Sequence, residues 1–140
     1  MDFLASNCVM ENLSFPDQVF KSLLFAPGNK RSILSKLPRS SPDASIIDLE
    51  DSVPTDEKTN ARETARVMIP ELSEKAKKMG LFVRVNAFET EHFAEDLSLA
   101  ISDELTGVIV PKISSKEEAD QISKSLSDFG FGNLPIMAGL

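Results

Sequence analysis

The 140-residue sequence contains one cysteine, Cys8, so no disulfide can form within the chain. This scarcity excludes a small secreted fold held together by disulfides, and it favours a reducing compartment, which we expect to be the cytoplasm. Long apolar runs are also missing, so we expect no membrane-spanning segment and no membrane partner. The first 18 residues contain no lysine or arginine, which separates them from secretory signals and from basic transit peptides.

Basic residues are outnumbered, with 15 lysines and arginines against 22 aspartates and glutamates and a net charge of -7. We therefore expect no nucleic-acid partner, because phosphate binding requires a basic surface. Histidine occurs once, at His92, which excludes a multi-histidine metal site and leaves Ser-His-Asp or Cys-His catalysis without support. Tryptophan and tyrosine are absent, yet 41% of the residues are hydrophobic, enough for one modest globular domain.

Five short apolar runs predict β-strands. None of them alternates apolar and polar residues cleanly, which is typical of strands that are buried on both faces of a parallel sheet. The runs cover residues 22–28, 44–50, 81–87, 106–112 and 134–140.

The stretches between these runs predict helices, at residues 29–37, 55–80, 91–104 and 115–130. Thr55 and Ser115 are suited to be N-caps, and acidic residues follow each of them, where they favour a helix start. We expect Pro70 to break or kink the second helix, which should end at Gly80.

The strict alternation of strands and helices predicts an α/β fold with a parallel sheet and right-handed crossovers. Two architectures are open at this point. One is a complete five-stranded doubly wound domain. The other is the N-terminal part, about five β/α units, of a TIM (β/α)₈ barrel, which needs about 250 residues in full. Both place their functional groups at the carboxyl ends of the strands.

Charged and polar residues follow the predicted strands. They are Lys30 or Arg31, then Asp48, Glu50 and Asp51, then Arg84 and Asn86, and finally Lys112. Gathered at one edge, they suit an anionic substrate with a divalent cation, because arginine binds carboxylates bidentately and carboxylate oxygens suit Mg²⁺. Structural interpretations also stay open: the acids as a solvated loop or N-cap, Arg84 as the counter-ion of a neighbouring strand's acid, and Lys112 as an ordinary strand-end lysine.

Four motifs together resemble one family. The segments KSLLFAPGNKRSILSKL, DASIIDLEDSVPTDEKTNAR, LFVRVNA and GVIVPKISSKEEA follow one another in the order and spacing of the citrate lyase beta-subunit family. This is the HpcH/HpaI aldolase-like group, which includes malyl-CoA and citramalyl-CoA lyases. The resemblance runs from about residue 20 to the last residue. It implies a (β/α)₈ barrel and a Mg²⁺-dependent lyase that cleaves or forms a carbon–carbon bond in a 3-hydroxy acid thioester.

The resemblance also implies partners and a residue that contacts substrate. The thioester carrier is coenzyme A or an acyl carrier protein, and complete members form homo-oligomers, trimers or hexamers. The family arginine that matches Arg84 contacts the substrate carboxylate, so we expect Arg84 to be catalytic and substrate-binding. Lys21 stands where the family usually has arginine; we expect it to bind substrate too, although lysine lacks the planar fork of arginine.

Further roles follow from the same resemblance. Glu50 and Asp51 are expected to line the Mg²⁺ site through water, and Pro27, Gly28 and Lys58 are expected on the side of the thioester carrier. The direct metal ligands of the family follow the fifth and sixth strands, so we expect none within this chain.

We expect residues 1–19 to form a poorly ordered arm and residues 20–140 to form a partial barrel truncated at the fifth strand. Little or no lyase activity is therefore expected of the 140 residues alone. Two non-catalytic interpretations stay open: a doubly wound α/β binding module, and a regulatory fragment that associates with a full-length homologue.

Overall fold

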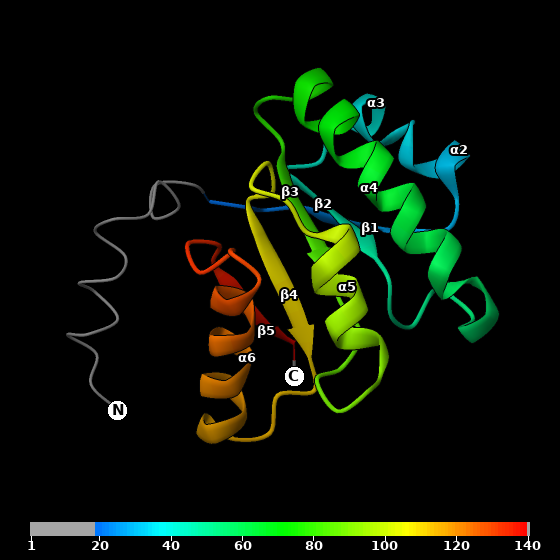
Figure 1. The fold of residues 1–140 in the computed structure, drawn as a ribbon. Helices are drawn as coiled ribbons and strands as arrows, with labels where there is room; N and C mark the ends of the chain where they lie inside the picture. The colour runs from blue at the N-terminus through cyan, green and yellow to red at the C-terminus, as the bar shows by residue number, and fades with distance from the viewer. Residues whose placement is uncertain (1–18, 140) are drawn as a thin grey trace.

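Strands and helices alternate along the chain in the computed structural model, which describes residues 19–139 (Figure 1). The strands are β1 (Leu23–Pro27), β2 (Ala44–Asp48), β3 (Gly80–Arg84), β4 (Gly107–Pro111) and β5 (Ile136–Gly139). The helices are α2 (Arg31–Leu34), α3 (Leu37–Ser40), the 3-10 helix η1 (Thr55–Glu57), α4 (Lys58–Lys75), α5 (His92–Ala100) and α6 (Lys116–Asp128). Apart from Val19, the arm predicted for residues 1–19 lies outside the described residues.

The described strands form one parallel sheet in sequence order, β1-β2-β3-β4-β5. This order decides between the two predicted architectures. A doubly wound sheet reverses its strand order at a switch point, whereas a (β/α)₈ barrel adds each strand beside the previous one. The predicted α/β fold, the N-terminal part of a TIM barrel, is confirmed. The doubly wound alternative is wrong.

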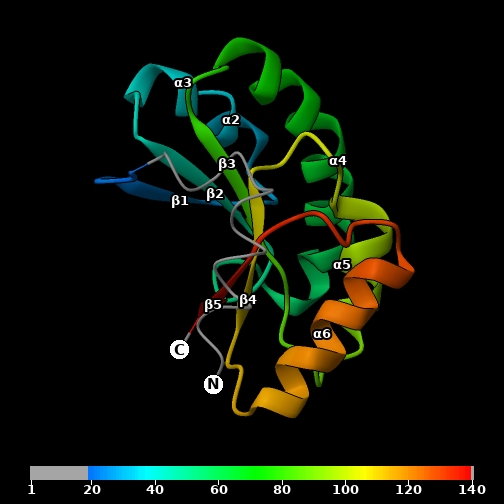
Figure 2. The ribbon, with the colours of Figure 1, turned by 90° about the vertical axis from the view of Figure 1, so that its left-hand side faces the viewer.

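Helices α2 to α6 pack on one face of the sheet. Their buried side chains share a single core with alternate strand residues such as Ile47 and Val83. The intervening residues, among them Ile46 and Phe82, form a separate small cluster on the other face. Figure 2 shows α4, α5 and α6 on the same side of the sheet. In a (β/α)₈ barrel the helices likewise cover the outer face of the sheet, and apolar side chains fill the inner face.

The exposure of the strands differs between the middle and the edges of the sheet. Every residue of β2 and β4 is buried, as the continuous apolar runs predict. The edge strands do not follow this prediction: Leu23 and Phe25 of β1 are 46% and 47% exposed, and Ile136 of β5 is 36% exposed. Within the described residues, β1 pairs only with β2 and β5 only with β4. Their outer edges therefore carry apolar side chains and unpaired backbone groups.

The predicted start and break of the second helix are wrong. Thr55 does not cap an α-helix; it opens the one-turn η1, and α4 begins at Lys58 with no side-chain cap hydrogen bond. The helix continues through Pro70 to Lys75. Buried apolar residues flank the proline on both sides, so their packing offsets the backbone hydrogen bond that proline removes.

Gly80 marks close packing and not a helix end, because it is the first residue of β3. A Cβ atom there would lie 2.6 Å from the Phe20 ring, so glycine lets the two segments approach. Ser115, in contrast, caps α6 as predicted, since its hydroxyl accepts a hydrogen bond from the backbone N–H of Glu118 at 3.1 Å. None of the helices within residues 19–139 combines the length and apolar content that a membrane span requires.

Removing the Ser115 hydroxyl tests this cap. We expect Ser115→Ala to lower the free energy of unfolding by about 1 kcal/mol, because the N–H of Glu118 loses its acceptor. Ser123→Ala, at an exposed position within α6, is the matched control and should leave stability unchanged or slightly higher. Urea unfolding measures both variants, and equal stabilities would contradict the cap.

Candidate functional site

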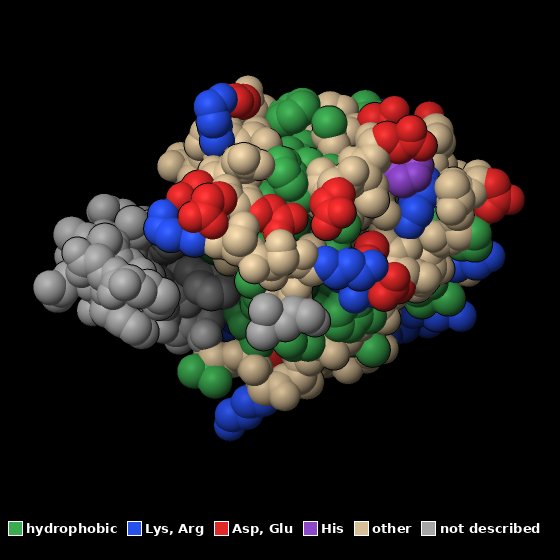
Figure 3. Space-filling model, turned by 90° about the horizontal axis from the view of Figure 1, so that it is seen from below, with side chains coloured by type: hydrophobic (Ala, Val, Ile, Leu, Met, Phe, Trp, Pro, Cys, Tyr) green, Lys and Arg blue, Asp and Glu red, His purple; other side chains and the backbone are tan. Residues whose placement is uncertain are grey.

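The carboxyl ends of the parallel strands meet at one edge of the sheet and surround a pocket of about 260 Å³, here called the rim pocket. Apolar side chains from β1, β2, β4 and β5 line its inner part. Figure 3 views this edge of the molecule and shows acidic and basic side chains close together among apolar ones. The charged residues that line the rim pocket are Glu50, Asp51, Arg84 and Lys112.

An ion pair across two strands anchors this edge. Asp48 on β2 and Arg84 on β3 are register partners. Arg84 donates from Nε to Oδ1 of Asp48 at 2.8 Å and from Nη2 to Oδ2 at 2.7 Å. Its guanidinium carbon also lies 4.8 Å from the centroid of the Phe25 ring on β1. The interpretation of Arg84 as the counter-ion of a neighbouring strand's acid is therefore confirmed, and two of its five guanidinium N–H groups donate to Asp48.

Asp48 is 1% exposed and also organises the turn after β2. Its carboxylate accepts hydrogen bonds from the backbone N–H groups of Glu50 and Ser52, and from the Ser52 hydroxyl at 2.6 Å. Burial raises the pKa of Asp48, but the hydrogen bonds from Arg84 and from this turn outweigh burial and lower the pKa to about 2. Asp48 is therefore neither a solvated loop residue nor a helix N-cap, but an ionised, buried counter-ion.

Glu50 lies between two cations of the rim pocket. Its Oε2 is 3.1 Å from Nζ of Lys112, and its Oε1 is 3.7 Å from Nη1 of Arg84. The hydrogen bond to Glu50 raises the pKa of Lys112, and the hydrogen bond to Asp48 raises the pKa of Arg84. Asp51 is exposed and lines the same pocket. The structure thus brings together Arg84, Glu50 and Asp51, as predicted.

Lys58 points inward, toward the loop that carries Glu50. The residue is 8% exposed, and its ammonium donates to the carbonyl oxygens of Leu49 at 2.8 Å and Glu50 at 2.7 Å. Burial lowers the pKa of Lys58. The lysine therefore ties the start of α4 to this loop, and its ammonium is already bound by two carbonyls.

The Pro27–Gly28 turn lies against the same loop. Pro27 is the register partner of Asp48 on the β1 side, and the N–H of Gly28 donates to the Asp48 carbonyl oxygen at 2.8 Å. A Cβ atom at Gly28 would lie 2.8 Å from Cδ2 of Leu49 and 2.9 Å from that carbonyl oxygen. Glycine is required here because the backbone passes so close to Asp48.

Comparison with known proteins identifies the family of the chain. Residues 21–137 match the family described as HpcH/HpaI aldolase/citrate lyase. The chain belongs to this family. The resemblance carried by the four sequence motifs is thereby confirmed.

Two relatives have related activities in their names. A citrate lyase subunit beta-like protein of Deinococcus radiodurans is 43% identical over 130 residues, which are 91% of this chain and 45% of the relative. A (3S)-malyl-CoA thioesterase of Cereibacter sphaeroides is 32% identical over 109 residues, which are 78% of this chain and 38% of the relative. The chain therefore spans less than half the length of these curated relatives.

A solved structure of the family matches the fold. The protein CitE of Mycobacterium tuberculosis, in complex with magnesium, acetoacetate and coenzyme A, is 25% identical, with a TM-score of 0.63. The match covers 86% of this chain and 40% of that chain.

The described residues contain no complete site for a metal ion such as the Mg²⁺ bound in the CitE structure. Within residues 19–139, no group of three or more His, Cys, Asp or Glu side chains is placed to hold a metal ion. Glu50 and Asp51 offer oxygen ligands of the right chemistry at the rim pocket. The pair alone is too small for a complete metal site.

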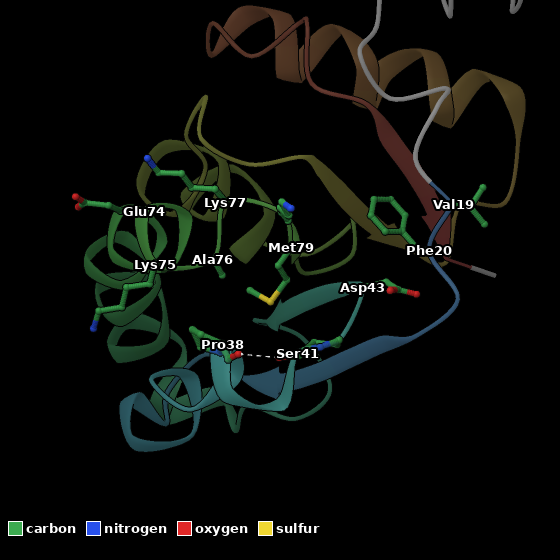
Figure 4. Close-up of a pocket in the computed structure, with 12 residues that line it drawn as sticks. Val19, Phe20, Pro38, Ser41, Asp43, Glu74, Lys75, Ala76, Lys77 and Met79 are labelled. Atoms are coloured by element: carbon green, nitrogen blue, oxygen red, sulfur yellow. Dashed lines mark hydrogen bonds between the residues drawn. The ribbon is translucent and has the colours of Figure 1, made fainter.

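Lys21 lies at the opposite edge of the sheet, just before β1. Its backbone N–H and that of Ser22 donate to the Asp43 carboxylate at 2.6 and 2.9 Å. A cavity of about 690 Å³ opens at this edge, and Figure 4 shows Asp43, Phe20 and Met79 around it. Since β1 spans roughly 17 Å, the structure does not bring Lys21 to the rim pocket, and its expected substrate role has no support there.

Three further residues predicted at the carboxyl edge lie outside the rim pocket. Lys30 and Arg31 are exposed after β1, and Arg31 lies 3.8 Å from Glu71 on α4. Asn86 is 4% exposed, and both its backbone N–H and its side-chain amide donate to Oδ2 of Asp96 at 2.7 Å. Asn86 therefore joins β3 to α5.

A second polar network, missed in the sequence, joins α4 to α5. Arg62 is 2% exposed and donates from Nε to Asp96 at 2.7 Å. Its Nη1 lies 2.7 Å from Glu95 and its Nη2 lies 2.8 Å from Nδ1 of His92, which is half-buried. The sequence does contain one indication that Arg62 is buried. Arg62 precedes Ala65 by three positions and therefore lies on the same, apolar face of the helix.

Acid should destabilise the fold through Asp48. Its pKa is about 2 in the fold against an ordinary 3.8, so the stabilisation is fully present above about pH 4 and is lost as the pH falls toward 2. The shift corresponds to about 2 kcal/mol. Asp48→Asn should lose roughly 2–4 kcal/mol at neutral pH, because Arg84 loses its partner. It should also show a flatter decline in acid.

Urea unfolding at a series of pH values measures both effects. Asp51→Asn removes an exposed carboxylate of the same turn and is the matched control, expected to keep wild-type stability at neutral pH. A decline in acid that is as steep in Asp48→Asn as in the wild type would contradict this role of Asp48.

Proposed function

We propose that this chain forms part of the active site of a Mg²⁺-dependent carbon–carbon lyase acting on a 3-hydroxy acid thioester of the malyl-CoA, citramalyl-CoA or citryl type. The observation that carries the proposal is the meeting of Arg84, Glu50 and Asp51 in the rim pocket of a family barrel. Barrel enzymes place their chemistry at this edge. The bound magnesium, acetoacetate and coenzyme A of the tuberculosis CitE protein support the same class of substrate.

Arg84 would hold the carboxylate of the 2-oxo acid half of the substrate. Asp48 accepts one hydrogen bond from Nε and one from Nη2, so Nη1, which makes no hydrogen bond to Asp48, is the nitrogen that we assign to the ligand. The bidentate grip that the sequence suggested is thus directed at Asp48, and the substrate would receive a contact from Nη1. Because Asp48 fixes the orientation of the guanidinium, little side-chain freedom is lost when a carboxylate binds.

The two carboxylates of the rim pocket would form one wall of the metal site. Glu50 and Asp51 would contact Mg²⁺ through its water, while the direct ligands come from outside these 140 residues. When bound, Mg²⁺ polarises the oxygen on which charge develops as the carbon–carbon bond breaks. On this account the isolated chain has little or no lyase activity.

The thioester carrier would approach beside the Pro27–Gly28 turn. Lys58 contributes by holding the loop that carries Glu50, because its ammonium already binds two carbonyl oxygens. Coenzyme A and an acyl carrier protein both suit this arrangement. Assembly of a complete chain into trimers or hexamers stays a prediction.

Thioester hydrolysis is a second candidate activity, favoured by the name of the (3S)-malyl-CoA thioesterase relatives. Cleavage of malyl-CoA yields glyoxylate and acetyl-CoA, whereas hydrolysis consumes water and yields malate and free coenzyme A. The two candidates are therefore separated by their products.

A regulatory fragment that associates with a full-length homologue also stays a prediction. The exposed apolar side chains Leu23, Phe25 and Ile136 on the edge strands support it. Pull-down of the full-length Deinococcus radiodurans relative by this chain tests it, and no association would remove it.

The lyase proposal is tested on two forms of the protein: the 140-residue chain, and the same chain continued by the remaining part of the Deinococcus radiodurans relative. With malyl-CoA or citramalyl-CoA and Mg²⁺, we expect acetyl-CoA release from the extended form and little from the short one. Activity in the short chain would mean that its own carboxylates bind the metal directly.

Arg84→Ala in the extended form tests the substrate contact. We expect kcat/KM to fall by roughly 10²–10³-fold, because the substrate carboxylate loses its charged partner. Arg39→Ala, at an exposed position of helix α3, is the matched control and should retain wild-type activity. Unchanged turnover by a folded Arg84→Ala protein would refute the role of Arg84.

A further inference from the structure

Lys112 follows β4 with a backbone φ of 59°, in the left-handed region. A long side chain rarely adopts this conformation, because its Cβ meets the following carbonyl oxygen. A backbone hydrogen bond holds it there: the N–H of Lys112 donates to the carbonyl oxygen of Gly139, at the end of β5, at 2.7 Å.

The left-handed backbone changes the face on which Lys112 lies. Side chains alternate across a strand, and Ile109 belongs to the inner cluster while Val110 belongs to the helix-covered core. Regular alternation would put Pro111 inside and Lys112 on the helix side. Instead, Pro111 and Lys112 both line the rim pocket. The strained residue therefore delivers a cation to the candidate site.

Glu50 shows how this cation can bind a carboxylate. Nζ of Lys112 lies 3.1 Å from Oε2 of Glu50, and Nη1 of Arg84 lies 3.7 Å from Oε1. The two cations thus contact different oxygens of one carboxylate. The Lys112 side chain is 66% exposed, whereas that of Glu50 is 7% exposed. An ion pair with one partner so exposed is weak and exchanges readily with other ions.

We propose that Lys112 is a second carboxylate-binding residue of the rim pocket, held on Glu50 in the absence of substrate and transferred to the carboxylate of a 2-oxo acid that binds beside Arg84. The inference rests on the proposed function, since it takes Arg84 as the first contact. Arg84 has one guanidinium nitrogen outside its pair with Asp48. A second cation gives the carboxylate a charge-assisted contact from another strand, which helps to fix its orientation.

The test is a titration of the ¹⁵N-labelled 140-residue chain with pyruvate, without divalent cations, followed by NMR chemical shifts. We expect Lys112→Met to weaken binding by about fivefold or more, because a charge-assisted contact is lost. Lys112→Arg should stay within about twofold of the wild type, because the charge is kept. Glu50→Gln should tighten binding by about twofold or more, because it releases Lys112 and removes a competing carboxylate.

The control is Lys116→Met, at an exposed lysine that pairs with Asp120 on α6; it should not change binding. A lysine that only neutralises Glu50 would leave pyruvate binding unchanged in Lys112→Met, and that result overturns the proposal. Weaker binding in Glu50→Gln overturns it as well. If Arg84→Met abolishes binding and Lys112→Met does not, the proposed function stands and this inference fails. No binding by the wild-type chain overturns this inference, whereas the proposed function is overturned by a lack of turnover in the extended form.

Discussion

The candidate site depends on one ion pair across neighbouring strands, between the buried Asp48 and the partly buried Arg84. Parallel register places the two residues side by side at the carboxyl edge, and two short hydrogen bonds join them. A buried carboxylate without such a partner would be costly, so the pair makes the charged edge compatible with a folded core. It also fixes the orientation of the Arg84 guanidinium, with Nη1 outside the pair.

The loop after β2 is arranged around this pair. The Asp48 carboxylate accepts hydrogen bonds from the backbone N–H groups of Glu50 and Ser52. The N–H of Gly28 donates to the carbonyl oxygen of Asp48. The ammonium of Lys58 donates to the carbonyl oxygens of Leu49 and Glu50. Glu50 is thereby held nearly buried beside the rim pocket. A carboxylate kept there by the backbone can pair with Lys112. In the proposed enzyme it would also accept hydrogen bonds from water bound to Mg²⁺.

The alternation of apolar runs and helical stretches predicted the elements, and the strand-end rule predicted that Arg84, Glu50 and Asp51 meet. Alternation could not choose between the doubly wound sheet and the barrel, because both have the same element order and only strand order separates them. The sequence also predicted Lys112 at this edge. Its left-handed backbone could not be predicted, because that conformation is usually marked by a glycine and here the residue is a lysine. The substrate role expected of Lys21 stays a prediction, and its position before β1 puts it at the other edge of the sheet.

The measurement that tests the account most directly is a double-mutant cycle on the central pair. Urea unfolding of Asp48→Ala, Arg84→Ala and the double variant gives the coupling free energy between the two side chains. We predict a favourable coupling of about 2 kcal/mol or more, because each single change leaves the other charge without its partner. A coupling near zero would mean that the pair does not hold this edge together, and the site built on it would have to be abandoned.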